Sequence, residues 1–183
     1  MIAKYRFELR PTVSTDITGL MGIDHSCDSE YVWQLDLQKS SGQIAAVLRE
    51  VRLPRAIHVK YPREVFSLAD EWNHNTRMLT ALGSNQHPVG YIRYFENVTA
   101  GSVWISDLAV SLESRRRGIG TALVLSVQDW ASEQGFRQIF LEMPSKNHPA
   151  ICMAHKLGFE FSGYNDHYYA TQDVALFFGR YLR

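Results

Sequence analysis

The stretch DLAVSLESRRRGIGTALVLSVQDWASEQG, residues 107–135, decides the fold of this chain. It starts in an apolar strand, passes through a basic turn with two glycines, and continues as a helix. In the helical part the apolar residues recur every third or fourth position, at Ile119, Leu123, Val127 and Trp130. The first N–H groups of a helix lack intrahelical partners and carry the positive end of the helix dipole. Three consecutive arginines before the glycines therefore indicate that this turn binds a phosphorylated ligand.

The composition is that of one globular domain. The 183 residues are 45% hydrophobic and 12% aromatic, and 19 basic against 19 acidic side chains give a formal charge of zero. A neutral chain is not expected to bind nucleic acid by neutralising phosphates. No apolar run approaches the roughly 20 residues that span a bilayer, and the N-terminus lacks the apolar core of a signal peptide. We therefore expect a cytoplasmic protein without membrane contact, in which Cys27 and Cys152 are free thiols.

The order of the elements predicts a mixed α/β (α+β) fold. Strand patterns cover residues 3–9, 78–82, 88–95, 103–110 and 137–143, a second helix covers 150–157, and a final hairpin covers 160–169 and 174–181. The helical crossover from 103 to 143 makes those two strands parallel, whereas short loops elsewhere predict antiparallel neighbours. Ligands bind at the carboxyl ends of parallel strands, so Val110 and Met143 mark the expected site.

The N-terminal part has weaker patterns. Arg10-Pro11 is expected to end the first strand, because proline cannot donate to a β-ladder. Ser14-Thr15-Asp16 offers N-cap side chains for a short helix that carries Ile17 to Ile23. Residues 31–35 and 47–59 look extended, but Pro54, Pro62 and scattered charges break the period. We expect residues 25–75 to form an irregular region that packs on the core and contributes a binding surface.

Two motifs carry a family resemblance. Arg115–Gly120 reads RRRGIG and follows the apolar strand end Leu108-Ala109-Val110, and Asn147 is followed by Ala150 and by the helix-closing pair Gly158-Phe159. In this order and spacing the chain resembles the GCN5-related N-acetyltransferases (GNAT superfamily), whose two acyl-CoA signatures have these residue types. The resemblance covers residues 77–181. The tail from Gly163 to Phe178 is also similar to the end of streptothricin acetyltransferases.

The resemblance implies a single N-acetyltransferase domain over residues 1–183, with 1–76 on the substrate side and 77–183 forming the acyl-CoA-binding core and the C-terminal hairpin. It implies a mostly antiparallel central sheet with one splayed parallel strand pair and flanking helices. Acetyl-CoA (coenzyme A) is the implied co-substrate. The residues expected to bind it are Leu108, Ala109, Val110, Arg115, Arg116, Arg117, Gly118, Ile119, Gly120, Thr121 and Asn147. The two rival phosphate motifs are disfavoured, because no P-loop string occurs and Leu123 stands where a dinucleotide fingerprint needs a small residue.

Three residues are candidates for the chemistry. Glu142 lies five residues before Asn147, where several family members have a catalytic glutamate, and it is our first candidate for the base that takes a proton from the acceptor amine. An ordinary carboxylate at the sheet edge, or one that binds the substrate's cation, stays open as an alternative. Asp107 is the second candidate, although strand alternation could turn it to solvent. Ala154 replaces the tyrosine that the family uses to protonate the departing thiolate, and Tyr168 is a candidate to replace it, together with Tyr164, Tyr169 and His155.

The expected activity is direct transfer of an acetyl group from acetyl-CoA to a primary amine. We predict no metal site, because His148 and His155 have no third ligand nearby in the sequence. The acceptor stays open: six carboxylates could bind a small polycationic amine or an antibiotic, or could be solvated surface, namely Asp28, Glu30, Asp36, Glu64, Asp70 and Glu71. A protein N-terminal or lysine acetyltransferase, a non-catalytic acyl-CoA binder and a nucleotide-binding oxidoreductase domain are the alternatives. A homodimer is also open.

Overall fold

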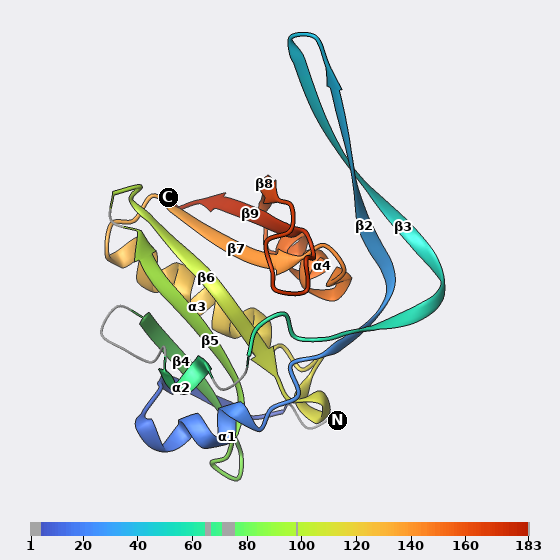
Figure 1. Ribbon diagram of the computed structural model, residues 1–183. Helices are drawn as coiled ribbons and strands as arrows, with labels where there is room; N and C mark the ends of the chain where they lie inside the picture. The colour runs from blue at the N-terminus through green and yellow to red at the C-terminus, as the bar shows by residue number, and fades with distance from the viewer. Residues whose placement is uncertain (1–4, 65–66, 71–75, 98, 183) are drawn as a thin grey trace.

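A seven-stranded sheet in the order β1-β4-β5-β6-β7-β9-β8 forms the centre of the molecule (Figure 1). The computed structural model describes residues 5–64, 67–70, 76–97 and 99–182. The strands are β1 (Phe7–Pro11), β4 (Thr76–Gly83), β5 (Pro88–Asn97), β6 (Ser102–Val110), β7 (Gln138–Pro144), β8 (Glu160–Asn165) and β9 (Ala175–Tyr181). Among the described strands of this sheet, β6 and β7 are the one parallel pair. The predicted mixed, mostly antiparallel sheet is therefore confirmed.

The helices cover both faces of the sheet. The longer helices α3 (Ile119–Glu133) and α4 (His148–Lys156) pack on one face, where Leu123, Val127 and Ile151 join the main core. The short helices α1 (Ile17–Met21) and α2 (Ser67–Asp70) pack on the other face, against a smaller cluster that includes Leu20, Leu68 and Tyr91. Tyr91 and its neighbour Ile92 contribute to opposite faces, as alternation along a strand requires.

Two expectations about the N-terminal part are corrected. β1 includes Arg10 and Pro11, and Pro11 lies opposite Leu79 of β4; the proline is tolerated because β1 is an edge strand. Ser14, Thr15 and Asp16 form a 3-10 turn, η1 (Ser14–Asp16), and Asp16 holds the N-cap position of α1 without a capping side-chain bond to that helix. The Asp16 carboxylate accepts the N–H of Val13 at 2.9 Å and pairs with Arg10 at 2.7 Å. The part of the first strand pattern that falls on residues 1–4 lies outside the described residues.

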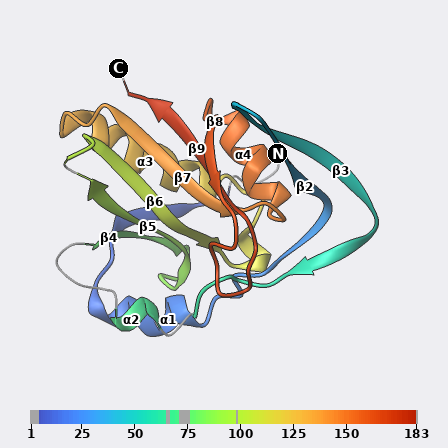
Figure 2. The same ribbon diagram turned by 45° about the horizontal axis from the view of Figure 1, so that its top comes forward.

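The segment expected to be irregular contains a long hairpin instead. β2 (Cys27–Ser40) and β3 (Gln43–Val59) pair with each other in a separate two-stranded sheet, called the arm below. Its turn is Ser41-Gly42, and Gly42 has the positive φ of 76° that favours glycine. Pro54 lies where the ladder is interrupted, between the pairs Ser29–Ile57 and Tyr31–Arg52, so its missing N–H costs no ladder bond. The lower part of the arm passes α4 (Figures 1 and 2), and in Figure 1 its tip extends beyond the rest of the molecule.

β6 and β7 separate at their carboxyl ends. Their parallel ladder runs from Ser102–Gln138 to Ile105–Leu141 and ends there, although both strands continue. On the other edge of β6, Asp107 lies opposite Arg93 and Ile105 opposite Tyr94, so Ser106 is an extra residue that makes a β-bulge. A bulge bends its strand and strengthens the local twist. We attribute the opening between the two strands to this bulge.

Among the described residues, no helix has the length and apolar character needed to cross a membrane.

Candidate active site

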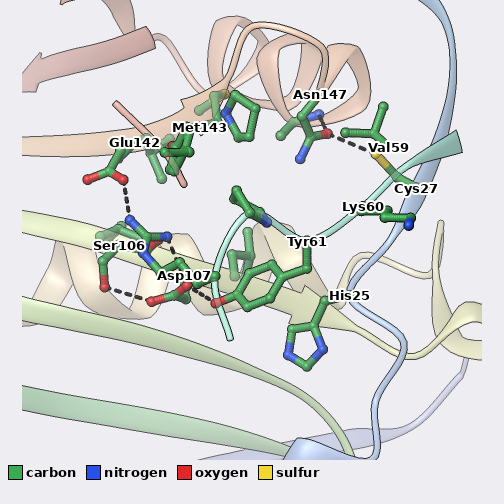
Figure 3. Close-up of a pocket in the computed structure, with 18 of the residues that line it drawn as sticks. His25, Cys27, Val59, Lys60, Tyr61, Ser106, Asp107, Glu142, Met143 and Asn147 are labelled. Carbon is green, nitrogen blue, oxygen red and sulfur yellow. Dashed lines mark hydrogen bonds and ion pairs between the residues drawn. The ribbon is translucent and has the colours of Figure 1, made fainter. Parts of the chain in front are cut away.

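A pocket lies where β6 and β7 separate, and the base of the arm, with the start of β2 and the end of β3, contributes to its walls (Figure 3). β6 provides Ser106, Asp107 and Leu108, and β7 with the loop after it provides Glu142, Met143 and Asn147. Further walls come from α4, from Tyr169, and from the base of the arm with the residues just before and after it, among them His25, Cys27, Val59, Tyr61 and Arg63. Two of the three predicted catalytic residues, Glu142 and Asp107, therefore line one pocket.

Asp107 is buried and saturated with hydrogen-bond donors. Its side chain is 1% exposed, and Oδ2 accepts from Arg93 Nε at 2.5 Å and from Ser106 Oγ at 2.9 Å. Oδ1 accepts from Arg63 Nη1 at 3.1 Å and from the Tyr61 hydroxyl, which points at it in Figure 3. Burial alone would raise the pKa of Asp107, but the guanidinium groups of Arg63 and Arg93 outweigh burial and hold this pKa below its usual value. The alternative that Asp107 faces solvent is thus wrong.

Arg63 bridges the two carboxylates of the pocket. Besides its bond to Asp107, its Nη2 group donates to Oε1 of Glu142, whose side chain is 4% exposed. The Arg63 guanidinium also lies over the ring of Tyr169, 5.5 Å from its centroid. Burial would lower the pKa of Arg63, but the carboxylates of Asp107 and Glu142 outweigh burial and raise this pKa. A cation that belongs to the protein therefore holds the acidic end of the pocket.

Tyr168 is the third member of this group. Its hydroxyl donates to Oε2 of Glu142 at 3.1 Å. Partial burial, followed by the nearby Glu142 carboxylate, raises the pKa of Tyr168, so the hydroxyl stays protonated well above neutral pH. Ala154, at the position of the family tyrosine, is fully buried in the core. Of the other replacements considered, His155 packs against Trp33 and Phe178 instead, in the last turn of α4, whereas Asn147 lies at the N-terminus of that helix.

The turn before α3 has the features of an anion site. Gly118 is the N-cap residue in the left-handed conformation, with φ of 87°, and the first helical bond runs from the N–H of Ala122 to its carbonyl. Within the described residues no side chain caps this helix, so the N–H groups of residues 119–121 have no intrahelical partner. Ile119 itself is buried, and its contribution is limited to the backbone.

The three arginines of this turn have different surroundings. Arg115 donates to the carbonyl oxygens of Val110 at 2.8 Å and Asp24 at 2.7 Å, and so fixes the end of β6. The Arg117 guanidinium lies over the Tyr5 ring, 4.4 Å from its centroid. Arg116 is exposed and has the positive φ of 62°. The side chain of Arg115 therefore has a structural role, whereas Arg116 and Arg117 are both exposed.

The other residues predicted to bind acetyl-CoA lie nearby. Leu108, Ala109 and Val110 pair with β5 on one edge, and past Ile105 the β6 edge toward β7 has no described strand beside it. Asn147 is the N-cap of α4: its side-chain oxygen accepts the N–H of Ala150 at 3.2 Å and the thiol of Cys27 at 3.5 Å.

Several pocket residues were not predicted. Tyr61, Arg63 and Arg93 hold Asp107, and His25 bonds the Tyr91 hydroxyl through Nε2 at 3.0 Å. Burial lowers the pKa of His25, so this ring is neutral at neutral pH. The one available signal was the Tyr61-Pro62-Arg63 sequence directly after an extended segment, since loops that follow strands often carry function.

The carboxylates proposed to bind a cationic acceptor do not gather at the pocket. Asp28 and Asp36 are on the arm, where they pair with His58 at 3.0 Å and Arg49 at 3.2 Å. Glu30 and Glu64 are exposed. Glu71 and the side chain of Asp70 lie outside the described residues. The acidic groups that do line the pocket are Asp107 and Glu142.

Comparisons with known proteins agree on one family. Residues 45–159 match the model of the Acetyltransferase (GNAT) family. Streptothricin acetyltransferase of Streptomyces lavendulae is 25% identical over 161 residues, which cover 86% of this chain and 83% of that protein. The crystal structure of nourseothricin acetyltransferase superposes with a TM-score of 0.82 at 21% identity, over 97% of this chain and 99% of that one. A Bacillus anthracis (strain Ames) protein, provisionally assigned as a streptothricin acetyltransferase and solved with acetyl-CoA, superposes with a TM-score of 0.73 at 22% identity, over 96% and 99%.

Proposed function

Because the chain belongs to the Acetyltransferase (GNAT) family, we propose that it transfers the acetyl group of acetyl-CoA directly to a primary amine of a small cationic acceptor. The observation that supports this most is the separation of β6 and β7, which leaves the buried carboxylates of Asp107 and Glu142 lining a pocket. The match to the Acetyltransferase (GNAT) family excludes the alternative of a nucleotide-binding oxidoreductase domain.

Acetyl-CoA would bind along the free edge of β6. Its pyrophosphate needs short donors, and the N–H groups of residues 119–121 with the accessible Arg116 offer them. A Cβ added at Gly120 would lie 3.6 Å from Met153 Sδ and 3.8 Å from Leu108 Cδ2, so the glycine keeps a narrow space open between α3, α4 and β6. The edge at Leu108–Val110 has backbone groups that can pair with the pantetheine arm like a missing strand.

Glu142 is the group we assign as proton acceptor. The ammonium form of the acceptor has no lone pair, so it must lose a proton before attacking the thioester carbonyl. Asp107 is poorly suited to this task, because four donors surround it and its pKa is held low. Its role in the proposal is to anchor Arg63 and Tyr61, which form a wall of the pocket.

Tyr168 completes the proton transfer in this proposal. When the amine attacks, the carbonyl carbon loses its bond to sulfur, and the Tyr168 hydroxyl protonates the departing thiolate. The same hydroxyl is bonded to Oε2 of Glu142, so the proton that Glu142 took from the amine can pass to the tyrosine oxygen. An ammonium acceptor loses two protons in all: one reaches coenzyme A as its thiol and the other leaves to solvent, so both side chains return to their starting states.

Arg63 must give way when the acceptor binds. An ammonium group that approaches Glu142 meets a carboxylate already paired with Arg63. We propose that a cationic acceptor displaces Arg63 from Glu142, while Arg93 continues to compensate Asp107. A neutral acceptor cannot make this exchange, because it would leave Glu142 without a cation.

A small cationic acceptor is supported by the two buried carboxylates and by the relatives, which are named for streptothricin and nourseothricin. The decisive experiment is a panel of amines with acetyl-CoA, read as released coenzyme A. We expect turnover with polycationic small molecules. Turnover confined to peptides with a free N-terminus or lysine would support a protein acetyltransferase instead, and acetyl-CoA binding without turnover across the panel would contradict the proposed catalysis.

The Glu142→Gln variant tests the proton acceptor. It removes the base but keeps the shape and can still accept from Tyr168, so we expect kcat to fall about 100-fold, with acetyl-CoA affinity unchanged by calorimetry. Glu133→Gln, a matched change at an exposed site on α3, should leave kcat unchanged. Full activity of Glu142→Gln across the pH range would exclude Glu142 as the base.

A further inference from the structure

A second group of reactive side chains lies on α4, outside the pocket. The Sγ atom of Cys152 lies 3.2 Å from Nε2 of His148, one helical turn earlier. Nδ1 of His148 lies 3.2 Å from Oε1 of Glu50, on β3 of the arm. The Tyr31 ring stacks on His148 with 4.9 Å between centroids and fixes the plane of the imidazole. A thiol, an imidazole and a carboxylate are therefore in contact, in the order found in cysteine nucleophiles.

These contacts indicate which atom holds which proton. A carboxylate can only accept, so the Glu50 carboxylate favours a neutral imidazole with its proton on Nδ1. Nε2 is then unprotonated and is the ring nitrogen nearer to Sγ of Cys152, at 3.2 Å against 3.9 Å for Nδ1. Partial burial and then the Glu50 carboxylate raise the pKa of Cys152. The sulfur is consequently protonated at rest and depends on His148 to take its proton when it reacts.

Cys152 is accessible and has a positive neighbour. Its side chain is exposed, whereas Cys27 is half-buried and its thiol donates a hydrogen bond to Asn147. The positive charge of Arg116, an exposed arginine of the turn before α3, lowers the pKa of Cys152 against the larger effect of burial. An anionic molecule that approaches Cys152 would therefore be attracted by Arg116.

We propose that Cys152 is a modification site that undergoes exchange with anionic low-molecular-weight disulfides. His148 takes the thiol proton as the sulfur attacks, a new disulfide forms between Sγ and one half of the reagent, and the other half leaves as a thiolate that takes up the proton. The disulfide reagent is the oxidant, so the electrons balance. Coenzyme A disulfide, with its phosphates, and glutathione disulfide, with its carboxylates, share this chemistry.

The test measures the rate at which each cysteine of the full-length protein is modified, by mass spectrometry of its peptides. With either anionic disulfide we expect Cys152 to react at least about tenfold faster than Cys27, and coenzyme A disulfide to react faster than glutathione disulfide if phosphates are the preferred anion. Cystamine, a cationic disulfide, should modify Cys152 more slowly than both. Equal rates at the two cysteines, or a preference for cystamine, would overturn the proposal.

Variants separate the cluster from simple exposure. His148→Asn should slow modification of Cys152 at least about tenfold, whereas His155→Asn, on the same helix but packed against Trp33 and Phe178, should not change it. Glu50→Gln, an exposed change that leaves the core intact, should slow it severalfold and so gives an answer even if His148→Asn is unstable. An unchanged rate in both His148→Asn and Glu50→Gln would show that Cys152 reacts merely because it is exposed.

A final measurement links this site to acetyl-CoA and rests on the proposed function. If the pyrophosphate binds at the turn before α3, saturating acetyl-CoA should protect Cys152, and the modified protein should bind acetyl-CoA more weakly until a reducing agent releases the group. If acetyl-CoA did not protect Cys152, while His148→Asn still slowed its modification, the proposed acetyl-CoA position would be wrong and the thiol site would stand.

Discussion

Arg63 is the residue on which the arrangement of the pocket depends most. Its guanidinium pairs with two carboxylates whose side chains are 1% and 4% exposed, while its own side chain is 22% exposed. Removing one partner of a buried ion pair leaves an uncompensated charge, which is far more costly than losing a surface pair. Asp107 keeps Arg93 when Arg63 is removed, so the cost falls mainly on Glu142.

The Arg63→Ala variant should lower the free energy of unfolding by about 3 kcal/mol, measured by urea denaturation at neutral pH. Arg49→Ala is the matched control, because Arg49 pairs with Asp36 where the two side chains are 65% and 43% exposed, and it should cost less than about 1 kcal/mol. Equal losses in the two variants would mean that the Arg63 bridge contributes no more than a surface pair. Arg63→Lys, which keeps one cation but cannot bridge both carboxylates, should fall between the two.

At the scale of single residues, the sequence predicted side chains on one side of the pocket. Glu142 was predicted because it lies at the end of a strand five residues before Asn147, Asp107 because it interrupts an apolar strand, and Tyr168 as a replacement for the tyrosine that is missing at Ala154. Arg63 and Tyr61 could not be predicted, since they follow an extended segment without periodicity and acquire their role only through contact with Asp107, more than 40 positions later in the chain. A loop residue gives no local signal for a partner so distant in sequence.

At the scale of the elements, the two glycines at the start of α3, Gly118 and Gly120, have different roles. Gly118 has φ of 87°, where an L side chain is strained, although a Cβ there would meet nothing within 4 Å. Gly120 is ordinary helix, and a Cβ there would make normal contacts with Met153, Leu108 and Val110. The first glycine therefore serves the backbone turn, and the second serves the space beside it.

Gly120→Ala should accordingly keep or slightly raise stability, by up to about 1 kcal/mol from helix propensity, and weaken acetyl-CoA binding at least about tenfold in calorimetry. Gly118→Ala should instead act mainly on stability, with a loss of about 1 kcal/mol or more, and should weaken acetyl-CoA binding less than Gly120→Ala does. If Gly120→Ala bound acetyl-CoA as tightly as the unmodified protein, the proposed pyrophosphate position would be wrong.

Elements with strong local signals were predicted well, and the arm was not. α3 and α4 follow from apolar spacing, Gly135 and Gly158, and the order of strands from β4 to β7 follows from short loops and one crossover. The arm lacks such a pattern because it packs on the core over part of its length, through residues such as Trp33 and Leu48, whereas Leu37, Ile44 and Val47 are exposed. Its strands are defined by their pairing with each other, and Ser41-Gly42 was the single local cue to the turn.

For the whole molecule, buried titratable groups limit the pH range of stability. The folded-state pKa values of His25 and Asp107 are lowered from 6.5 and 3.8, so their contributions are present above those values and are lost as the pH falls below them. The folded-state pKa values of Tyr61, Tyr91 and Tyr169 are raised from 10.0, mainly by burial. Their contributions are fully present below pH 10 and are lost as the pH rises above it.

We therefore expect the free energy of unfolding to be flat from about pH 7 to about pH 9, and to fall on both sides, in urea titrations across pH. Tyr91→Phe removes one buried hydroxyl and should flatten the alkaline decline. Tyr181→Phe, at a side chain 76% exposed, should leave that decline unchanged. An alkaline slope equal in the two variants would show that buried tyrosines do not set this limit.

The arm is expected to open locally at a lower free energy than the seven-stranded sheet. Each of its strands has one unpaired edge among the described residues, whereas its base contacts α4 and the pocket. Amide hydrogens near Ser41-Gly42 should therefore exchange by local opening, without unfolding of the seven-stranded sheet, and protection should increase toward Cys27 and Val59. Because the base of the arm lines the pocket, amide exchange along this one hairpin, with and without the proposed acceptor, would measure how far an effect of binding extends from the pocket.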